Sequence, residues 1–372
     1  MEMLGNPATF VVWGGFALAF LFGAIANKAN FCTMGAVSDV VNMGHWGRMR
    51  MWLLAIAVAV LGANALALSG HVDIGKSIYQ RPSLSWLSLL VGGTLFGVGM
   101  SLPGGCANKN LIRVGGGSLR SLVVLTFLAV SGYMTLKGLF GQWRAAWLDP
   151  VAIDLTRFGW ADQGLPTMLA AAGLASAPAR WVAAGTVAVL LLAFVFADRR
   201  FRANSSQWLA GLALGALVVG GWYVSGHLGF GENPETLEIG YFATNTRTVE
   251  SLSFVAPLSF GLELLMLWTD KSLHVTFGIA SALGVALGSA AWALGTRSFR
   301  WEGFASFGDL RDQLIGATLM GFGGVTAMGC TVGQGLTGIS TLALGSFIAL
   351  ASIIGGAVVT LKFINWRAER EA

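Results

Sequence analysis

Long apolar runs separated by short polar stretches occupy most of this sequence. A helix needs about 17–25 apolar residues to cross the hydrocarbon core of a bilayer, and the chain contains about nine such runs. Only 11% of its residues are charged, whereas a soluble domain usually carries about 25%. We therefore expect an all-α polytopic membrane protein embedded in a lipid bilayer. The expected spans lie near residues 9–26, 49–69, 84–101, 118–140, 181–197, 208–226, 274–294, 313–327 and 343–363.

Four further apolar segments are too short, or too rich in glycine, to cross a membrane. The chain has 52 glycines, about twice the usual share, and glycine permits the unusual backbone angles of broken helices. Short interrupted segments of this kind point to the substrate site of a transporter. We expect them to form re-entrant half-helices. They cover residues 30–42, 104–115, 251–268 and 329–341.

An internal repeat relates two of these segments and the spans before them. GGTLFGVGMSLPGGC (92–106) matches GATLMGFGGVTAMGC (316–330) at seven of fifteen positions, and the match pairs Cys106 with Cys330. The copies begin an odd number of crossings apart, so they enter the membrane from opposite faces. An inverted repeat of this kind places a substrate near the bilayer midplane. We expect one transport domain (1–372) with inverted pseudo-two-fold symmetry, in which a linker with an extra span (about 142–207) joins halves near 9–141 and 208–363.

The three cysteines are the chemically distinctive residues. Cys32, Cys106 and Cys330 are far apart in sequence and form no CxxC pair, so we expect no disulfide framework, no metal site and no cofactor. A buried neutral thiol is a soft, weak S–H donor, and the N-terminus of a half-helix favours an anion. An anion that itself contains sulfur would match these donors well.

The residues around Cys106 and Cys330 are candidates for supporting the site. Their polar side chains either line the site or satisfy backbone groups that the helix breaks leave free, and the sequence does not distinguish these alternatives. Lys28 and Arg113 are candidates for an anion entrance because cations at membrane depth are costly, although Lys28 could equally extend to the interface. The supporting candidates are Gly104, Gly105, Asn108, Lys109, Gly329, Thr331, Gly333 and Gln334.

The charges of the loops orient the chain in the membrane. Residues 197–207 contain three arginines and one aspartate, whereas residues 227–250 contain four glutamates and one arginine. Because cytoplasmic loops carry an excess of Lys and Arg, we expect the first loop inside and the second outside. Nine spans then place the N-terminus outside and the C-terminus in the cytoplasm. The net charge of +5 is modest, and no basic stripe indicates nucleic-acid binding.

Three local motifs resemble the YeeE/YedE family of bacterial sulfur-transport membrane proteins. They are NKANFCTMGAVSD (27–39), FGVGMSLPGGCANKNLIRVGGGS (96–118) and MGFGGVTAMGCTVGQGL (320–336). The resemblance implies an hourglass-shaped fold in the bacterial inner membrane that imports thiosulfate and is not an enzyme. It also implies that the ion passes between thiols, with Cys106 and Cys330 as the principal relay residues and Cys32 as the third. Many family members pair with a small TusA-like sulfur-carrier protein.

The sequence departs from the family pattern beside these cysteines. Lys28 and Asn30 stand where the family usually has arginines, Asn108 and Lys109 follow the second cysteine, and Met328 replaces a glycine. These changes leave other sulfur or selenium species open as substrates. Two functions of other classes also remain: a membrane thiol-redox enzyme that uses Cys106 and Cys330, and a docking subunit for a cytoplasmic sulfur carrier.

Overall fold

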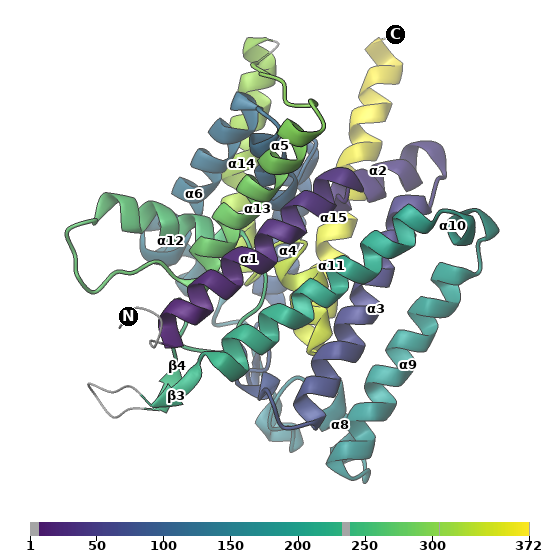
Figure 1. Cartoon of the computed structure of the whole chain (residues 1–372), viewed down its shortest axis with the longest axis vertical. Coiled ribbons are helices and arrows are strands. Elements are labelled where there is room, and N and C mark those ends of the chain that lie inside the picture. The colour runs from purple at the N-terminus through teal and green to yellow at the C-terminus, as the bar shows by residue number, and fades with distance from the viewer. Residues whose placement is uncertain (1–6, 233–238, 305, 372) are drawn as a thin grey trace.

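The computed structural model describes residues 7–232, 239–304 and 306–371. Two glutamates of the expected outer loop, Glu235 and Glu238, lie outside these residues. Within them the chain is built almost entirely from helices (Figure 1). Two small antiparallel sheets lie in the loops: β1 (Ser83–Leu84) pairs with β2 (Ile153–Asp154), and β3 (Phe230–Glu232) pairs with β4 (Ile239–Tyr241). The expectation of an all-α polytopic membrane protein is confirmed.

A helix lies at each of the nine positions where we expected a span. Seven of the described helices are long and apolar enough to cross a membrane. The other two are α4, which has only 16 residues, and α14, which carries Asp309, Arg311 and Asp312 near its start. The nine helices are α1 (Pro7–Lys28), α3 (Gly47–Leu68), α4 (Trp86–Ser101), α6 (Leu119–Lys137), α9 (Ser176–Phe196), α11 (Ser205–Tyr223), α13 (Phe277–Gly295), α14 (Phe307–Thr326) and α15 (Leu344–Glu371).

Each of the four interrupted segments forms a short helix. These are α2 (Thr33–Met43), α5 (Ala107–Gly115), α12 (Val255–Met266) and the π-helix η6 (Gly333–Gly338). The remaining short helices lie in the connections. They are η2 (Ile74–Lys76), α7 (Leu139–Trp143), η3 (Arg144–Leu148), η4 (Leu155–Phe158), α8 (Leu165–Ala171), α10 (Arg199–Ala203) and η5 (Val224–Leu228).

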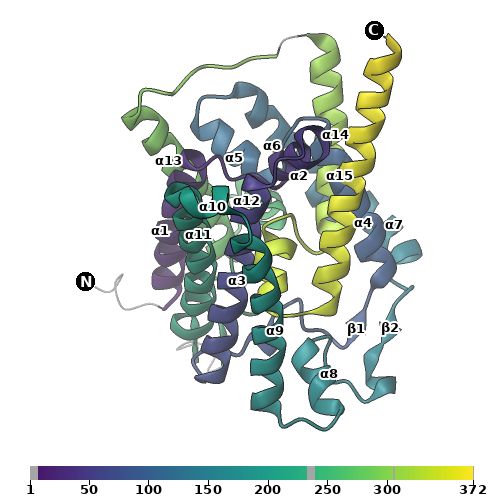
Figure 2. The ribbon, with the colours of Figure 1, turned by 90° about the vertical axis from the view of Figure 1, so that its right-hand side faces the viewer.

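Glycines bring α4 and α14 into direct backbone contact. A Cβ atom on Gly99 would lie 2.8 Å from the carbonyl oxygen of Gly316, and one on Gly323 would lie 2.5 Å from that of Gly92. Real Cβ atoms do not approach other atoms so closely, so only glycine fits at this crossing. On their other sides α4 packs against α15 and α14 against α6. Figure 2 shows α4, α14 and α15 close together.

The two faces of the molecule carry different elements. In Figure 1, α2, α5, α10 and the end of α15 lie towards the top, whereas β3, β4 and α8 lie towards the bottom. Helix α1 begins near the β3–β4 hairpin, and α15 ends at the opposite face. The first described helix therefore begins on one side of the molecule and the last one ends on the other side, as an odd number of crossings requires.

Candidate functional site

The three cysteines lie at the starts of short helices. Cys32 is the N-cap of α2, Cys106 is the N-cap of α5, and Cys330 lies three residues before η6. All three are unpaired and buried, with exposed fractions of 4%, 1% and 0%. Each thiol therefore lies at or close to the end of a short helix where backbone N–H groups lack carbonyl partners.

Backbone amides donate hydrogen bonds to two of these sulfurs. The N–H of Gly35 donates to Cys32 Sγ at 3.3 Å, and the N–H of Gly333 donates to Cys330 Sγ at 3.4 Å. In both cases the donor is three residues beyond the cysteine, which is the usual N-cap arrangement. Because the sulfur acts as acceptor in these bonds, its S–H group is free to donate to something else.

The segments that carry Cys106 and Cys330 meet in the interior. Thr331, the residue after Cys330, donates its hydroxyl to Cys106 Sγ at 3.2 Å. Cys106 is also close enough to the other two thiols to interact with each electrostatically. The fold thus gathers the three predicted cysteines into one buried region.

The break before Cys106 is stabilised by polar side chains of α5. Gly104 takes a φ of +64°, which favours glycine. Asn110 donates to the carbonyls of Gly105 and Cys106 at 3.0 and 3.1 Å. Arg113 donates to the carbonyls of Pro103 and Gly104, both at 3.1 Å. These two side chains therefore satisfy backbone groups that the break leaves free.

The break before Cys330 has a different construction. Met328 takes a φ of +55°, a left-handed conformation that side chains with a Cβ rarely adopt. Gln334 donates its side-chain amide N–H to the carbonyl of Ala327 at 2.5 Å. This bond connects η6 to the residue after α14 across the turn at Met328 and Gly329. Buried oxygens remain on both sides of the site, since Asn108 Oδ1 and Gln334 Oε1 accept no hydrogen bond within the described residues. Gln334 therefore satisfies the break with its amide N–H and keeps a buried oxygen that accepts no hydrogen bond within the described residues.

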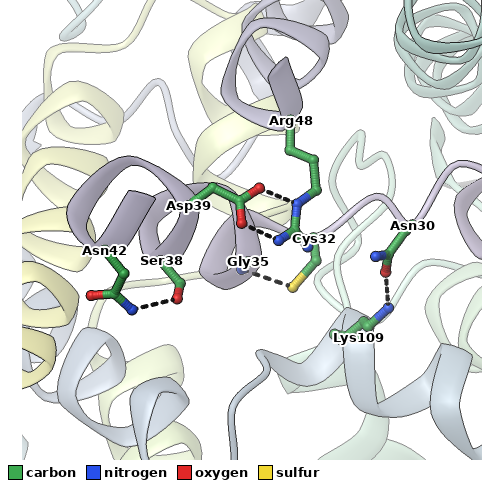
Figure 3. A network of polar contacts seen from close by, with 8 residues as sticks. All are labelled: Asn30, Cys32, Gly35, Ser38, Asp39, Asn42, Arg48 and Lys109. Carbon is green, nitrogen blue, oxygen red and sulfur yellow. Dashed lines mark hydrogen bonds and ion pairs between the residues drawn. The ribbon is translucent and has the colours of Figure 1, made fainter. Parts of the chain in front are cut away.

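A network of polar contacts surrounds Cys32 (Figure 3). Arg48 donates two hydrogen bonds to Asp39, whose side chain is only 6% exposed. The guanidinium lies directly against Gly35, so a Cβ there would collide with it. Lys109 Nζ donates to Asn30 Oδ1 at 2.6 Å, which links α5 to the residues before Cys32. Two cations thus flank this thiol, and sequence reasoning identified only Lys109 among the site residues.

Lys28 was predicted, together with Arg113, to form an anion entrance. It lies at the exposed end of α1. Its Nζ lies over the ring of Trp292, 5.2 Å from the centroid, at a distance typical of a cation–π contact. Its proposed role at an entrance stays a prediction, as does that of Arg113.

A cavity of about 440 Å³ opens on the side of the site that carries Cys330. Its lining includes Tyr79, Glu250, Ser253 and Gly329. A Cβ on Gly333 would lie 2.6 Å from Ser253 Oγ and 3.6 Å from the Tyr79 hydroxyl. The inner end of the cavity therefore reaches the loop that holds Cys330. Sequence reasoning missed this cavity because its walls come from loops distant in the chain.

Comparison with known proteins identifies what this arrangement resembles. The profile of the Sulphur transport family matches residues 28–359. The thiosulfate transporter TsuA of Spirochaeta thermophila is 25% identical over 352 residues, which cover 93% of this chain and 97% of that protein. The thiosulfate transporter TsuA of Escherichia coli is 24% identical over 371 residues, which cover 97% of each chain.

Proposed function

Because this chain belongs to the Sulphur transport family, we propose that it imports thiosulfate, or a closely related inorganic sulfur anion, across the bacterial inner membrane. It is a multi-pass membrane transporter of that family and not an enzyme. The names of the two relatives support thiosulfate as the substrate. In the molecule itself, one observation carries the proposal: Thr331 joins the segments of Cys106 and Cys330 at the buried centre.

The proposed mechanism is a passage between neutral donors. A lysine at the centre would bind an anion too tightly to release it, whereas S–H groups bind it weakly. The ends of the short helices add a favourable potential for negative charge. The ion enters the cavity beside Gly329, contacts Cys330 and Cys106 in turn, and leaves past Cys32. No bond to sulfur forms or breaks on this route.

The two repeat halves are proposed to be related by an inverted two-fold axis. The supporting contacts come in pairs that such an axis would exchange. Helix α4 packs on α15 as α14 packs on α6, and α1 packs on α13 as α11 packs on α3. The crossing of Gly99 with Gly316 is likewise exchanged with that of Gly92 with Gly323.

The proposed orientation places Cys32 on the cytoplasmic side. The arginine-rich helix α10 lies on the same face as α2 and α5 (Figure 1), and positive loops favour the cytoplasm. The cavity then opens outside, and the C-terminus lies in the cytoplasm. A TusA-like sulfur carrier is the proposed partner at this inner face.

Uptake in vivo tests the proposal. A bacterium that cannot take up sulfate is grown on thiosulfate as its sole sulfur source, with this chain or with Cys106→Ala or Cys330→Ala. We expect growth with the unmodified chain and little or none with either variant. Met43→Ala is the control, because Met43 is 69% exposed and lies away from the thiols. Failure of the unmodified, membrane-expressed chain to support growth contradicts the proposal.

The same experiment separates this function from a docking role. A subunit that only recruits a sulfur carrier needs no thiol at the membrane centre, so both alanine variants would then grow normally. Uptake of radiolabelled thiosulfate into liposomes that contain only the purified chain gives a second distinction, because a docking subunit alone moves no substrate.

A further inference from the structure

Glu250 is an unusual residue to find at an anion pathway. It lies in the loop between β4 and α12 and lines the cavity that leads towards Cys330. Its carboxylate oxygen Oε1 is buried and has no hydrogen-bond partner within the described residues. The backbone N–H of Asn245 is the donor that does reach its carboxylate. A bare carboxylate at this place would repel an incoming anion.

The main chain holds Glu250 firmly in this position. Its N–H donates to Ser225 Oγ at 3.3 Å, and the same hydroxyl donates back to its carbonyl. Ser225 belongs to η5 and is fully buried. The carboxylate is therefore built into the wall of the cavity by a fixed backbone and is not a mobile surface group.

No cation neutralises this carboxylate in the described part of the chain, where none lies within ion-pair distance of it. Arg144 also lines the cavity, but its guanidinium pairs with Asp149 at 3.1 Å. His227, on the same short helix as Ser225, is directed to the carbonyl of His71. The other charged and titratable groups that line the cavity are Tyr79, Arg81, Arg144 and Asp149. His227 lies on η5, the short helix that also carries Ser225, and Arg247 is an exposed residue of the loop that precedes Glu250.

Burial without a counter-charge favours the neutral acid. It raises the pKa of Glu250 from its ordinary value near 4.5 to about 8, because a low-dielectric site disfavours the charged form. A protonated carboxyl is an O–H donor. Near neutral pH the group thus changes from a source of repulsion into a hydrogen-bond donor for an anion.

We propose that Glu250 takes up a proton together with the transported anion, so that the outer cavity is a joint site for one proton and one sulfur oxyanion. This inference rests on the proposed function and adds a coupled proton to it. The proton passes from outside water to Oε1, and the resulting O–H donates to an oxygen of the anion. No covalent bond to the substrate is involved.

The coupling has a quantitative signature in binding. If the protonated form of Glu250 binds the anion, the thiosulfate Kd stays constant below the pKa of the free carboxyl and rises tenfold per pH unit above it. Calorimetric titration of the purified full chain with thiosulfate from pH 7 to 9.5 measures this slope. Thiosulfate itself does not titrate in this range.

Two variants complete the experiment. Glu250→Gln keeps a neutral donor of the same shape, so its Kd should not change between pH 7 and 9.5. Glu232→Gln removes an exposed glutamate on the same face and should keep the wild-type slope. A Glu250→Gln protein whose Kd still rises tenfold per pH unit above pH 8 overturns the inference.

Proton uptake by the unmodified chain gives a test that needs no variant. At pH 9, titrations in two buffers of different ionisation enthalpy should show close to one proton taken up for each thiosulfate bound. Binding without proton uptake overturns the role of Glu250 and leaves the proposed function intact. Absence of thiosulfate binding at every pH, in a folded protein, overturns both.

Discussion

The hydroxyl of Thr331 donates to Cys106 Sγ at 3.2 Å across 225 residues of sequence. This bond joins the two segments whose cysteines, Cys106 and Cys330, are paired by the sequence repeat. It also fixes the direction of the Cys106 thiol, because a sulfur that accepts on one side presents its S–H on another. The direction of the Cys106 thiol thus depends on Thr331, a residue of the segment that carries Cys330.

Loss of this hydroxyl should slow transport without unfolding the protein. Thr331→Val keeps the shape of the side chain but removes the donor. A hydrogen bond of this kind contributes about 1 kcal/mol, so we expect thiosulfate uptake to fall about fivefold. Thr331→Ser, which keeps the hydroxyl, should retain most of the activity. Liposome uptake of labelled thiosulfate measures both, and full activity in Thr331→Val would show that the bond is dispensable.

The ion pair beside Cys32 should contribute to stability. Arg48→Met leaves the buried carboxylate of Asp39 without its partner, and loss of one member of such a pair costs about 3 kcal/mol. The double variant Arg48→Met/Asp39→Asn removes the uncompensated charge and should recover much of that loss. Melting temperatures in detergent measure both proteins. Equal temperatures for the single and double variants would contradict the pairing.

The close crossing of α4 and α14 at glycines predicts that an alanine there lowers stability, and a glycine elsewhere in the chain provides the control. Gly99→Ala places a methyl group 2.8 Å from the carbonyl oxygen of Gly316, and overpacking of this kind costs about 1–3 kcal/mol. Gly185→Ala lies in the middle of α9 with nothing within 4 Å of the new methyl. It should stabilise the protein by about 0.5–1 kcal/mol, because alanine favours a helix more than glycine does. Melting temperatures that fall equally in both variants would contradict the close crossing.

The positions of the helices were predictable because apolar length is a local property. The break at Gly104 and Gly105 was also predictable, since glycines interrupt the run just before a cysteine. The roles of the polar residues were not, because they depend on which carbonyls the fold brings near. Asn110 and Arg113 are held on the backbone of the break, whereas Lys109 reaches across to Asn30.

The site residues that the sequence analysis did not identify come from parts of the chain that only the fold brings together. Arg48 begins the helix after Asp39, and nothing in its local pattern indicates that the chain folds back to pair them. Tyr79 and Glu250 are separated in the sequence by α4, α6, α9, α11 and their connections, yet both line the cavity next to Gly329. Only the packing of the spans brings such groups together, and the local pattern of apolar and polar residues does not predict which spans pack against each other.

The buried carboxyl of Glu250 should also make stability depend on pH. Its pKa is about 8 in the folded protein against an ordinary value near 4.5, so between these values the folded state holds a proton that the unfolded state has lost. Stability contributed by this group is complete below pH 4.5 and falls as the pH rises towards 8, by at most about 1.4 kcal/mol per pH unit. Above pH 8 the contribution is constant. Melting temperatures of the unmodified chain between pH 5 and 9 should follow this course.

Glu250→Gln identifies the source of that fall. The variant cannot lose a proton, so the difference between its melting temperature and that of the unmodified chain should widen from pH 5 to 8 and then stay level. Glu232→Gln should run parallel to the unmodified chain throughout, because this glutamate is exposed. A constant difference between Glu250→Gln and the unmodified chain across the range would mean that Glu250 has the same pKa in the folded and unfolded states, contrary to its burial in the cavity wall.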